Sequence, residues 1–110
     1  MKRTAKQAMT VSEAKQAILA WFDDNDPWRI YGPHMPAKIR QALGLPKAVF
    51  DAAVVELLRE RTVYCAEHDH PFRLRPEERE ELVADGRGVF YVTISDRRPA
   101  RPLPAEAIPA

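Results

Sequence analysis

The sequence predicts a small α+β domain that is mostly helical, with three helices followed by a small antiparallel sheet. Three observations support this class. Apolar residues recur at helical spacing in the first half of the chain, strand-forming residues gather in two later segments, and glycine and proline separate the segments. The 110 residues suffice for one hydrophobic core but not for two.

The first helix is predicted over residues 11–24. Thr10 and Glu13 have the spacing of a capping box, and apolar residues then recur every three or four positions: Val11, Ala14, Ile18, Trp21 and Phe22. Proline and glycine interrupt the next segment, residues 25–35, which is therefore predicted to be a loop. Three of its residues predict a very short strand: Trp28, Ile30 and Tyr31.

Two further helices follow, joined by a tight turn. The second begins at Pro36 and ends at Gly44, because proline suits the first position of a helix and glycine adopts the left-handed conformation that often ends one. Pro46 opens the third helix, which is predicted to run to about residue 61. Its apolar residues repeat at intervals of four and three: Phe50, Val54 and Leu57.

Two segments, residues 62–67 and 89–94, have the composition of strands that pair antiparallel. In the second strand, three side chains are expected to face one way: Phe90, Val92 and Ile94. Between the strands, Pro76 followed by two glutamates marks the start of a short helix. Residues 82–84 either end that helix or pair with residues 89–90 as a hairpin, and the sequence leaves both interpretations open.

The chain divides into a flexible basic lead (residues 1–9), the domain (10–94) and a flexible proline-rich tail (95–110). Its 17 Lys and Arg against 16 Asp and Glu give a net charge of +1, so any site for a polyanion must be local. Cys65 is the one cysteine, which excludes an intramolecular disulfide. Without a long apolar run, no membrane contact is expected, and we predict a cytoplasmic protein.

From Gly44 to Val63 the apolar residues and glycine have a particular spacing: Gly44, Leu45, Phe50, Val54, Leu57 and Val63. This spacing and the order of elements resemble the winged helix-turn-helix family over residues 11–94. The resemblance implies a small DNA-binding protein, a dimeric transcription or genome-maintenance factor that contacts mainly the phosphate backbone of duplex DNA. The basic residues at positions that would contact phosphate are Lys38, Arg40, Lys47, Arg73, Arg75 and Arg87.

The exposed positions of the third helix also support an alternative. Alanine and valine offer bases no hydrogen-bonding group, and four of them occupy the face that would enter the major groove: Ala48, Val49, Ala52 and Val55. The alternative is a winged-helix protein-interaction or dimerisation module. In that case, these four residues form an interface with a second copy of the chain or with another protein, and DNA is not read.

No catalytic, metal or cofactor site is expected. Cys65, His68 and His70 form the only cluster resembling metal ligands, and they are fewer than the four that a structural zinc site uses. A buried core cysteine and a solvated turn are the preferred interpretations of these residues. The sequence contains no glycine-rich phosphate loop and no evident nucleophile with a histidine partner, so the chain is predicted not to be an enzyme.

Overall fold

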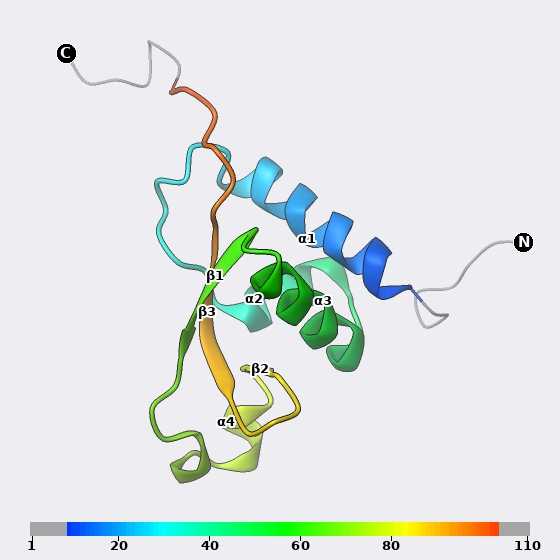
Figure 1. The fold of residues 1–110 in the computed structure, drawn as a ribbon, viewed down its shortest axis with the longest axis vertical. Helices are drawn as coiled ribbons and strands as arrows, with labels where there is room; N and C mark the ends of the chain where they lie inside the picture. Colours follow the sequence, from blue (N-terminus) through cyan, green and yellow to red (C-terminus); the bar gives the residue numbers. More distant parts are fainter. Residues whose placement is uncertain (1–8, 104–110) are drawn as a thin grey trace, which may run out of the picture.

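The computed structural model describes residues 9–103, and in it three helices pack together on one side of a three-stranded antiparallel sheet (Figure 1). A fourth, shorter helix lies in the connection between the two long strands of the sheet. The predicted α+β class is therefore confirmed. The predicted basic lead, apart from Met9, and residues 104–110 of the predicted tail lie outside the described residues.

Helix α1 spans Val11–Asn25 and begins with the predicted capping box. The Glu13 backbone N–H donates to the Thr10 hydroxyl at 3.0 Å, and the Glu13 carboxylate accepts from the Thr10 N–H at 3.0 Å. These two bonds satisfy backbone donors that a helix start otherwise leaves unpaired. The buried face of α1 consists of Ala14, Ile18, Trp21 and Phe22, the residues whose spacing predicted the helix.

Helix α2 spans Pro36–Leu43, and helix α3 spans Lys47–Arg59. Gly44 ends α2 in the left-handed conformation, with φ of 64°, and its N–H donates to the carbonyls of Arg40 and Gln41. A side chain at this position would strain the turn, which explains the glycine. The central part of the core lies between these helices and α1, and its fully buried residues include Ile18, Phe22, Ile39, Phe50, Val54 and Leu57.

The sheet has the strand order β1-β3-β2, so the last strand of the chain is the central one. Strand β1 spans Val63–Glu67, β2 spans Val83–Ala84 and β3 spans Phe90–Asp96. The pairing of Val83 with Tyr91 confirms the hairpin interpretation of residues 82–84. The connection between β1 and β3 also holds a 3₁₀ turn, η1 (Pro71–Arg73), and helix α4 (Pro76–Arg79), which begins at the predicted proline.

The prediction of a very short strand over residues 28–31 is wrong. These residues form a turn and a bend, because the Asp26 carboxylate accepts the N–H groups of Ile30 and Tyr31 and so keeps them from a strand partner. The bridge to the sheet forms three residues later. His34 and Ile94 exchange two backbone hydrogen bonds of 2.9 Å, which places His34 beside β3 on the side away from β1.

The prediction that Phe90, Val92 and Ile94 all face one way is also wrong. Ile94 is fully buried in the core, whereas Phe90 packs edge-on against Phe72 outside it, and Tyr91 contacts the core instead. The pairing of β1 with β3 shifts by one residue at Ala66 and Glu67. Such a bulge reverses the alternation of side chains beyond it.

Strand β3 continues to Asp96, two residues beyond the predicted domain limit at 94. The Asp96 carboxylate is wholly buried and binds the guanidinium groups of Arg29 and Arg98, each at 2.8 Å. Arg98 also pairs with Asp23 near the end of α1 at 2.9 Å. The first part of the predicted tail therefore packs against the loop that follows α1. None of the described helices is long and apolar enough to cross a membrane.

Candidate functional site

Two of the six basic residues predicted to contact phosphate are held by carboxylates. The Lys47 ammonium pairs with the buried Asp51 and donates to the Leu82 carbonyl at 2.9 Å. Arg75 pairs with Glu78 at 3.1 Å and with Glu77 at 3.4 Å. Lys47 thus points toward the β2 end of the connection, and its charge is neutralised locally.

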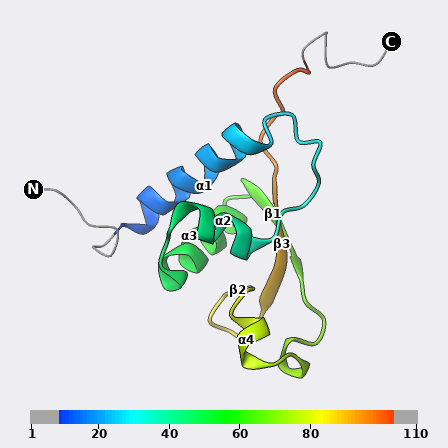
Figure 2. The same cartoon turned by 180° about the vertical axis from the view of Figure 1, so that it is seen from behind.

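The other four predicted cations, Lys38, Arg40, Arg73 and Arg87, make no ion pair within residues 9–103. Lys38 and Arg40 lie on α2, Arg73 on η1, and Arg87 in the turn between β2 and β3. Helix α2 packs among the larger helices, whereas η1 lies at the far end of the β1–β3 connection (Figures 1 and 2). These cations therefore do not gather into a single cluster.

Three of the four predicted interface residues line a groove between α3 and β2. Ala48, Ala52 and Val55 form the α3 wall, and residues 84–86 form the other wall. Val49 packs against the core and does not line the groove. The Val55 side chain packs partly against the core and also lines the groove. We call this surface the α3 groove; its remaining lining residues are charged, namely Asp51, Glu56, Arg59 and Asp85.

Asp51 connects the two walls of the α3 groove. Its carboxylate accepts from the Lys47 ammonium and, at 3.2 Å, from the Ala84 backbone N–H. Burial raises the pKa of Asp51, and these two hydrogen bonds lower it by less than burial raises it. Because Lys47 also binds the Leu82 carbonyl, two polar contacts join α3 to residues 82–84. The groove is therefore preformed.

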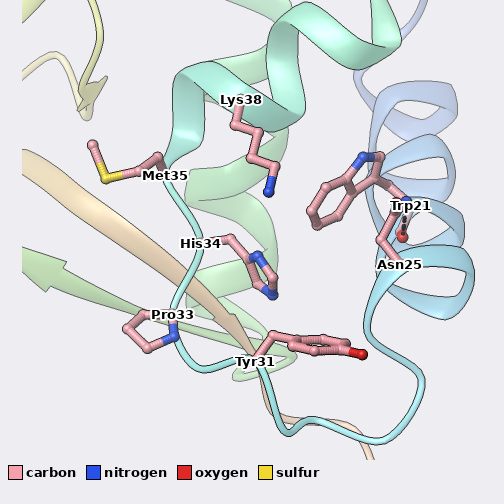
Figure 3. A pocket seen from close by; sticks show the side chains of 7 residues that line it. All are labelled: Trp21, Asn25, Tyr31, Pro33, His34, Met35 and Lys38. Atoms are coloured by element: carbon pink, nitrogen blue, oxygen red, sulfur yellow. Dashed lines mark hydrogen bonds between the residues drawn. The ribbon is translucent and has the colours of Figure 1, made fainter.

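A second concave surface lies where the end of α1, the loop 26–35 and the start of α2 meet (Figure 3). Its volume is about 320 Å³, within the range of small-molecule sites. Figure 3 shows the ring of Tyr31 and the indole of Trp21 on opposite sides of a space toward which His34 and Lys38 point. We call it the Tyr31 pocket; its lining residues are Trp21, Asn25, Tyr31, Pro33, His34, Met35 and Lys38.

The buried His34 and Asp26 hold the floor of the Tyr31 pocket in place. His34 Nε2 lies 3.0 Å from Asp26 Oδ2, and the other Asp26 oxygen accepts from the N–H groups of Ile30 at 3.0 Å and Tyr31 at 3.3 Å. Burial raises the pKa of Asp26, but these hydrogen bonds outweigh it and lower the pKa overall. The ionised carboxylate thus holds the imidazole and the loop in one arrangement.

Large apolar side chains surround the mouth of the Tyr31 pocket instead of filling the core. Tyr31 is 62% exposed and Met35 is 48% exposed, and the neighbouring Ile30 is 54% exposed. Trp21 lies deeper and contacts the His34 ring edge-on, with 5.1 Å between ring centroids. Exposed aromatic surface on a fixed backbone is a feature of binding sites.

The cluster of Cys65, His68 and His70 does not come together as a metal site in the described part of the chain. No group of three His, Cys, Asp or Glu side chains with ligand geometry occurs within residues 9–103. Cys65 is buried in the core beside Ile94, and burial raises the pKa of its thiol to about 12. The thiolate that zinc requires is therefore strongly disfavoured.

Sequence reasoning missed the Tyr31 pocket, because Trp21 was assigned to the core and Tyr31 to a strand. A usable signal was present: Tyr31, His34 and Lys38 are separated by three and four residues across a loop and the start of a helix. It also missed the pairing of Lys47 with Asp51, although their spacing of four residues on one helix is typical of ion pairs.

Comparison with known proteins adds no assignment. No protein-family model, no curated protein sequence and no solved structure matches this chain. Any function therefore has to be inferred from the two surfaces themselves.

Proposed function

We propose that this chain is a winged-helix interaction module that self-associates through the α3 groove. The order of elements supports the winged-helix part of the proposal. A first helix is followed by the bridging residue His34, two helices joined by a tight turn, and a strand pair separated by a long connection. In this fold family, α3 occupies the position of the helix that enters the major groove, and residues 68–89 occupy that of the wing.

One observation carries the proposal: the exposed face of α3 presents a strip of small apolar side chains where a DNA-reading helix would need hydrogen-bonding groups. Ala48, Ala52 and Val55 offer no hydrogen bond to a base, and the Asp85 carboxylate beside them would repel phosphates. Lys47, the cation nearest the start of α3, is neutralised by Asp51. Such a face suits a protein surface better than it suits DNA.

The chemistry of the α3 groove favours a second copy of the chain as its occupant. Arg59 lies on the same groove as the acidic Glu56 and Asp85, so two copies related by a two-fold axis can bring opposite charges together. The small side chains of Ala48 and Ala52 allow a second helix to approach closely. Charges of both signs around an apolar strip are what a self-complementary interface needs.

Analytical ultracentrifugation of matched variants tests self-association. Ala48→Glu places a carboxylate on an exposed position of the groove and is expected to convert a dimer into a monomer, because the buried charge has no counter-ion at a two-fold interface. Ala20→Glu is the control, since Ala20 is also an exposed alanine but lies on α1 outside the groove. A wild type that remains monomeric at high concentration, or a dimer that tolerates Ala48→Glu, contradicts the proposal.

Binding to the DNA backbone is the second candidate, and the four cations without ion pairs favour it. Three of them, Lys38, Arg73 and Arg87, are exposed. If they contact phosphates, their combined replacement by alanine reduces the slope of log affinity against log salt by up to about 3, equally for all DNA sequences. Arg75→Gln, which removes a cation already paired with glutamates, is the control. An unchanged slope in the triple variant excludes these three residues as phosphate contacts.

A further inference from the structure

We propose that the Tyr31 pocket binds a planar base carrying a phosphate, the chemistry of a nucleoside monophosphate. Such a group has two sources: a free nucleotide, or the terminal nucleotide of a nucleic-acid strand. The pocket and its volume of about 320 Å³ suit one base with its phosphate. The proposal does not depend on self-association, because the pocket is built from α1, the loop 26–35 and α2, whereas the α3 groove is built from α3 and β2.

Tyr31 supplies the open stacking surface for a base, and the largely buried Trp21 lines the opposite side of the pocket. The Tyr31 ring is 62% exposed, so one of its faces is open to a stacking partner. The Trp21 indole lies across the pocket from it (Figure 3), and the ring of His34 closes the side between them. Stacking between aromatic side chains and bases is favourable for every base, because each base has an open π face.

Lys38 supplies the cation for a phosphate. Its side chain is exposed, forms no ion pair within residues 9–103 and points into the pocket (Figure 3). The buried Asp26 carboxylate beneath the pocket is occupied by His34 and by two backbone N–H groups. Lys38 is therefore the one uncompensated charge among the lining residues of the pocket, and it selects an anion.

Two polar atoms can meet the edge of a base. Asn25 donates through its amide nitrogen to the Trp21 carbonyl at 2.9 Å, which leaves its amide oxygen available as an acceptor. His34 uses Nε2 toward Asp26, which is the one hydrogen bond of its ring to another of residues 9–103. In the neutral ring, Nδ1 accepts a hydrogen bond. Both atoms therefore complement the N–H groups of bases.

The backbone around the pocket is fixed before any ligand binds. His34 is bonded to Ile94 through both its backbone groups, and Asp26 holds the N–H groups of Ile30 and Tyr31. A ligand then has to order only the side chains of Tyr31, Met35 and Lys38. A preformed site of this kind loses little affinity to conformational ordering.

Calorimetric titration and Trp21 fluorescence test the proposal, with Trp28→Phe leaving Trp21 as the only indole of the chain. The free probes are AMP, adenosine and ribose 5-phosphate. The strand-end probes are a blunt DNA duplex and the same duplex with one unpaired 3′ adenosine. We expect a preference of at least about 10-fold in one of two comparisons. Either AMP binds more tightly than ribose 5-phosphate, or the overhang duplex binds more tightly than the blunt duplex.

Two variants separate the roles of the pocket residues. Tyr31→Ala is expected to weaken binding of the preferred probe by about 10-fold, and Lys38→Ala to weaken AMP by about 10-fold while leaving adenosine unchanged. The controls are Tyr64→Ala, an exposed tyrosine on β1, and Arg97→Ala, an exposed cation after β3. The Ala48→Glu variant, with its α3 groove disrupted, is expected to bind as the wild type does.

The outcomes decide both the site and its source. If AMP binds tightly and the overhang duplex binds no better than the blunt duplex, the ligand is a free nucleotide. If the overhang duplex is preferred and AMP binds weakly, the ligand is a strand end. The proposal is overturned if neither probe binds, if ribose 5-phosphate binds as tightly as AMP, or if Tyr31→Ala or Lys38→Ala has no more effect than its control. A wild type that binds nucleotide but stays monomeric would contradict the proposed function alone.

Discussion

Asp26 and Asp51 are both buried carboxylates, yet their pKa values shift in opposite directions. Asp26 is 3% exposed and lies under the Tyr31 pocket, and Asp51 is 9% exposed and lies in the α3 groove. Burial is the largest influence on both and raises the pKa in each case. At Asp26, hydrogen bonds from His34 and two backbone N–H groups outweigh burial, whereas at Asp51 those from Lys47 and one backbone N–H do not.

The comparison teaches that the number of fixed donors decides whether a buried charge stabilises the fold. The lowered pKa of Asp26 contributes stability that is present above its unfolded-state pKa and is lost as the pH falls through the folded value. The raised pKa of Asp51 acts in the opposite sense: the fold gains stability as the pH falls through the folded value, because protonation removes a buried charge.

The largest expected effect is at Asp26. Replacing Asp26 by Ala leaves His34 Nε2 and the N–H groups of Ile30 and Tyr31 without their acceptor, at a cost of about 2 to 4 kcal/mol at neutral pH. Urea unfolding followed by circular dichroism measures it. The loss is expected to shrink as the pH falls, because the wild type itself loses the contribution of Asp26. A loss that is the same at all pH values would show that the Asp26 charge is irrelevant.

An intermediate effect is expected for Lys47→Met, which keeps the length of the side chain and removes the cation. The Asp51 carboxylate is then buried beside a single backbone donor, and the Leu82 carbonyl also loses its partner. We expect the free energy of unfolding to fall by about 1 to 2 kcal/mol near pH 7. Solvent limits this loss, because the Lys47 side chain is 23% exposed. The loss should shrink as the pH falls, because burial raises the pKa of Asp51 and protonation removes its buried charge.

The smallest effect is expected for Asp51→Asn, which removes the charge but keeps an oxygen that accepts from Ala84. Because the charge of Asp51 is disfavoured by burial, stability should change by less than about 1 kcal/mol near neutral pH. The same urea experiment, performed beside Asp26→Asn, sharpens the comparison. If Asp51→Asn destabilises the protein more than Asp26→Asn does, the order of the two sites is reversed and our account of them is wrong.

The helices were predictable from sequence because their signals are local. Thr10, Gly44 and the apolar spacing from Phe50 to Leu57 each act within one or two turns, and the structure places α1, α2 and α3 within two residues of the predicted limits. The strands β1 and β3 were predictable for the same reason, from their composition.

The features that failed depend on contacts between distant segments. Asp26 captures backbone groups of the loop, so the bridge to β3 forms at His34 and not at residues 28–31. The bulge in β3, where Val92 is skipped in the pairing with β1, has no local sequence pattern that marks it. The two concave surfaces are likewise made by elements far apart in the chain, which is why only the α3 wall of one of them was foreseen, from Ala48, Ala52 and Val55.

The central position of β3 has a consequence for the order in which this chain can fold during synthesis. Helices α1, α2 and α3 precede residue 60 and bury much of the core among themselves. Strands β1 and β2 pair only with β3, and Asp96 and Arg98 at its end complete the contacts to the loop after α1. On the ribosome, the three helices can therefore associate early, whereas the sheet and the base of the loop wait until residue 98 has emerged.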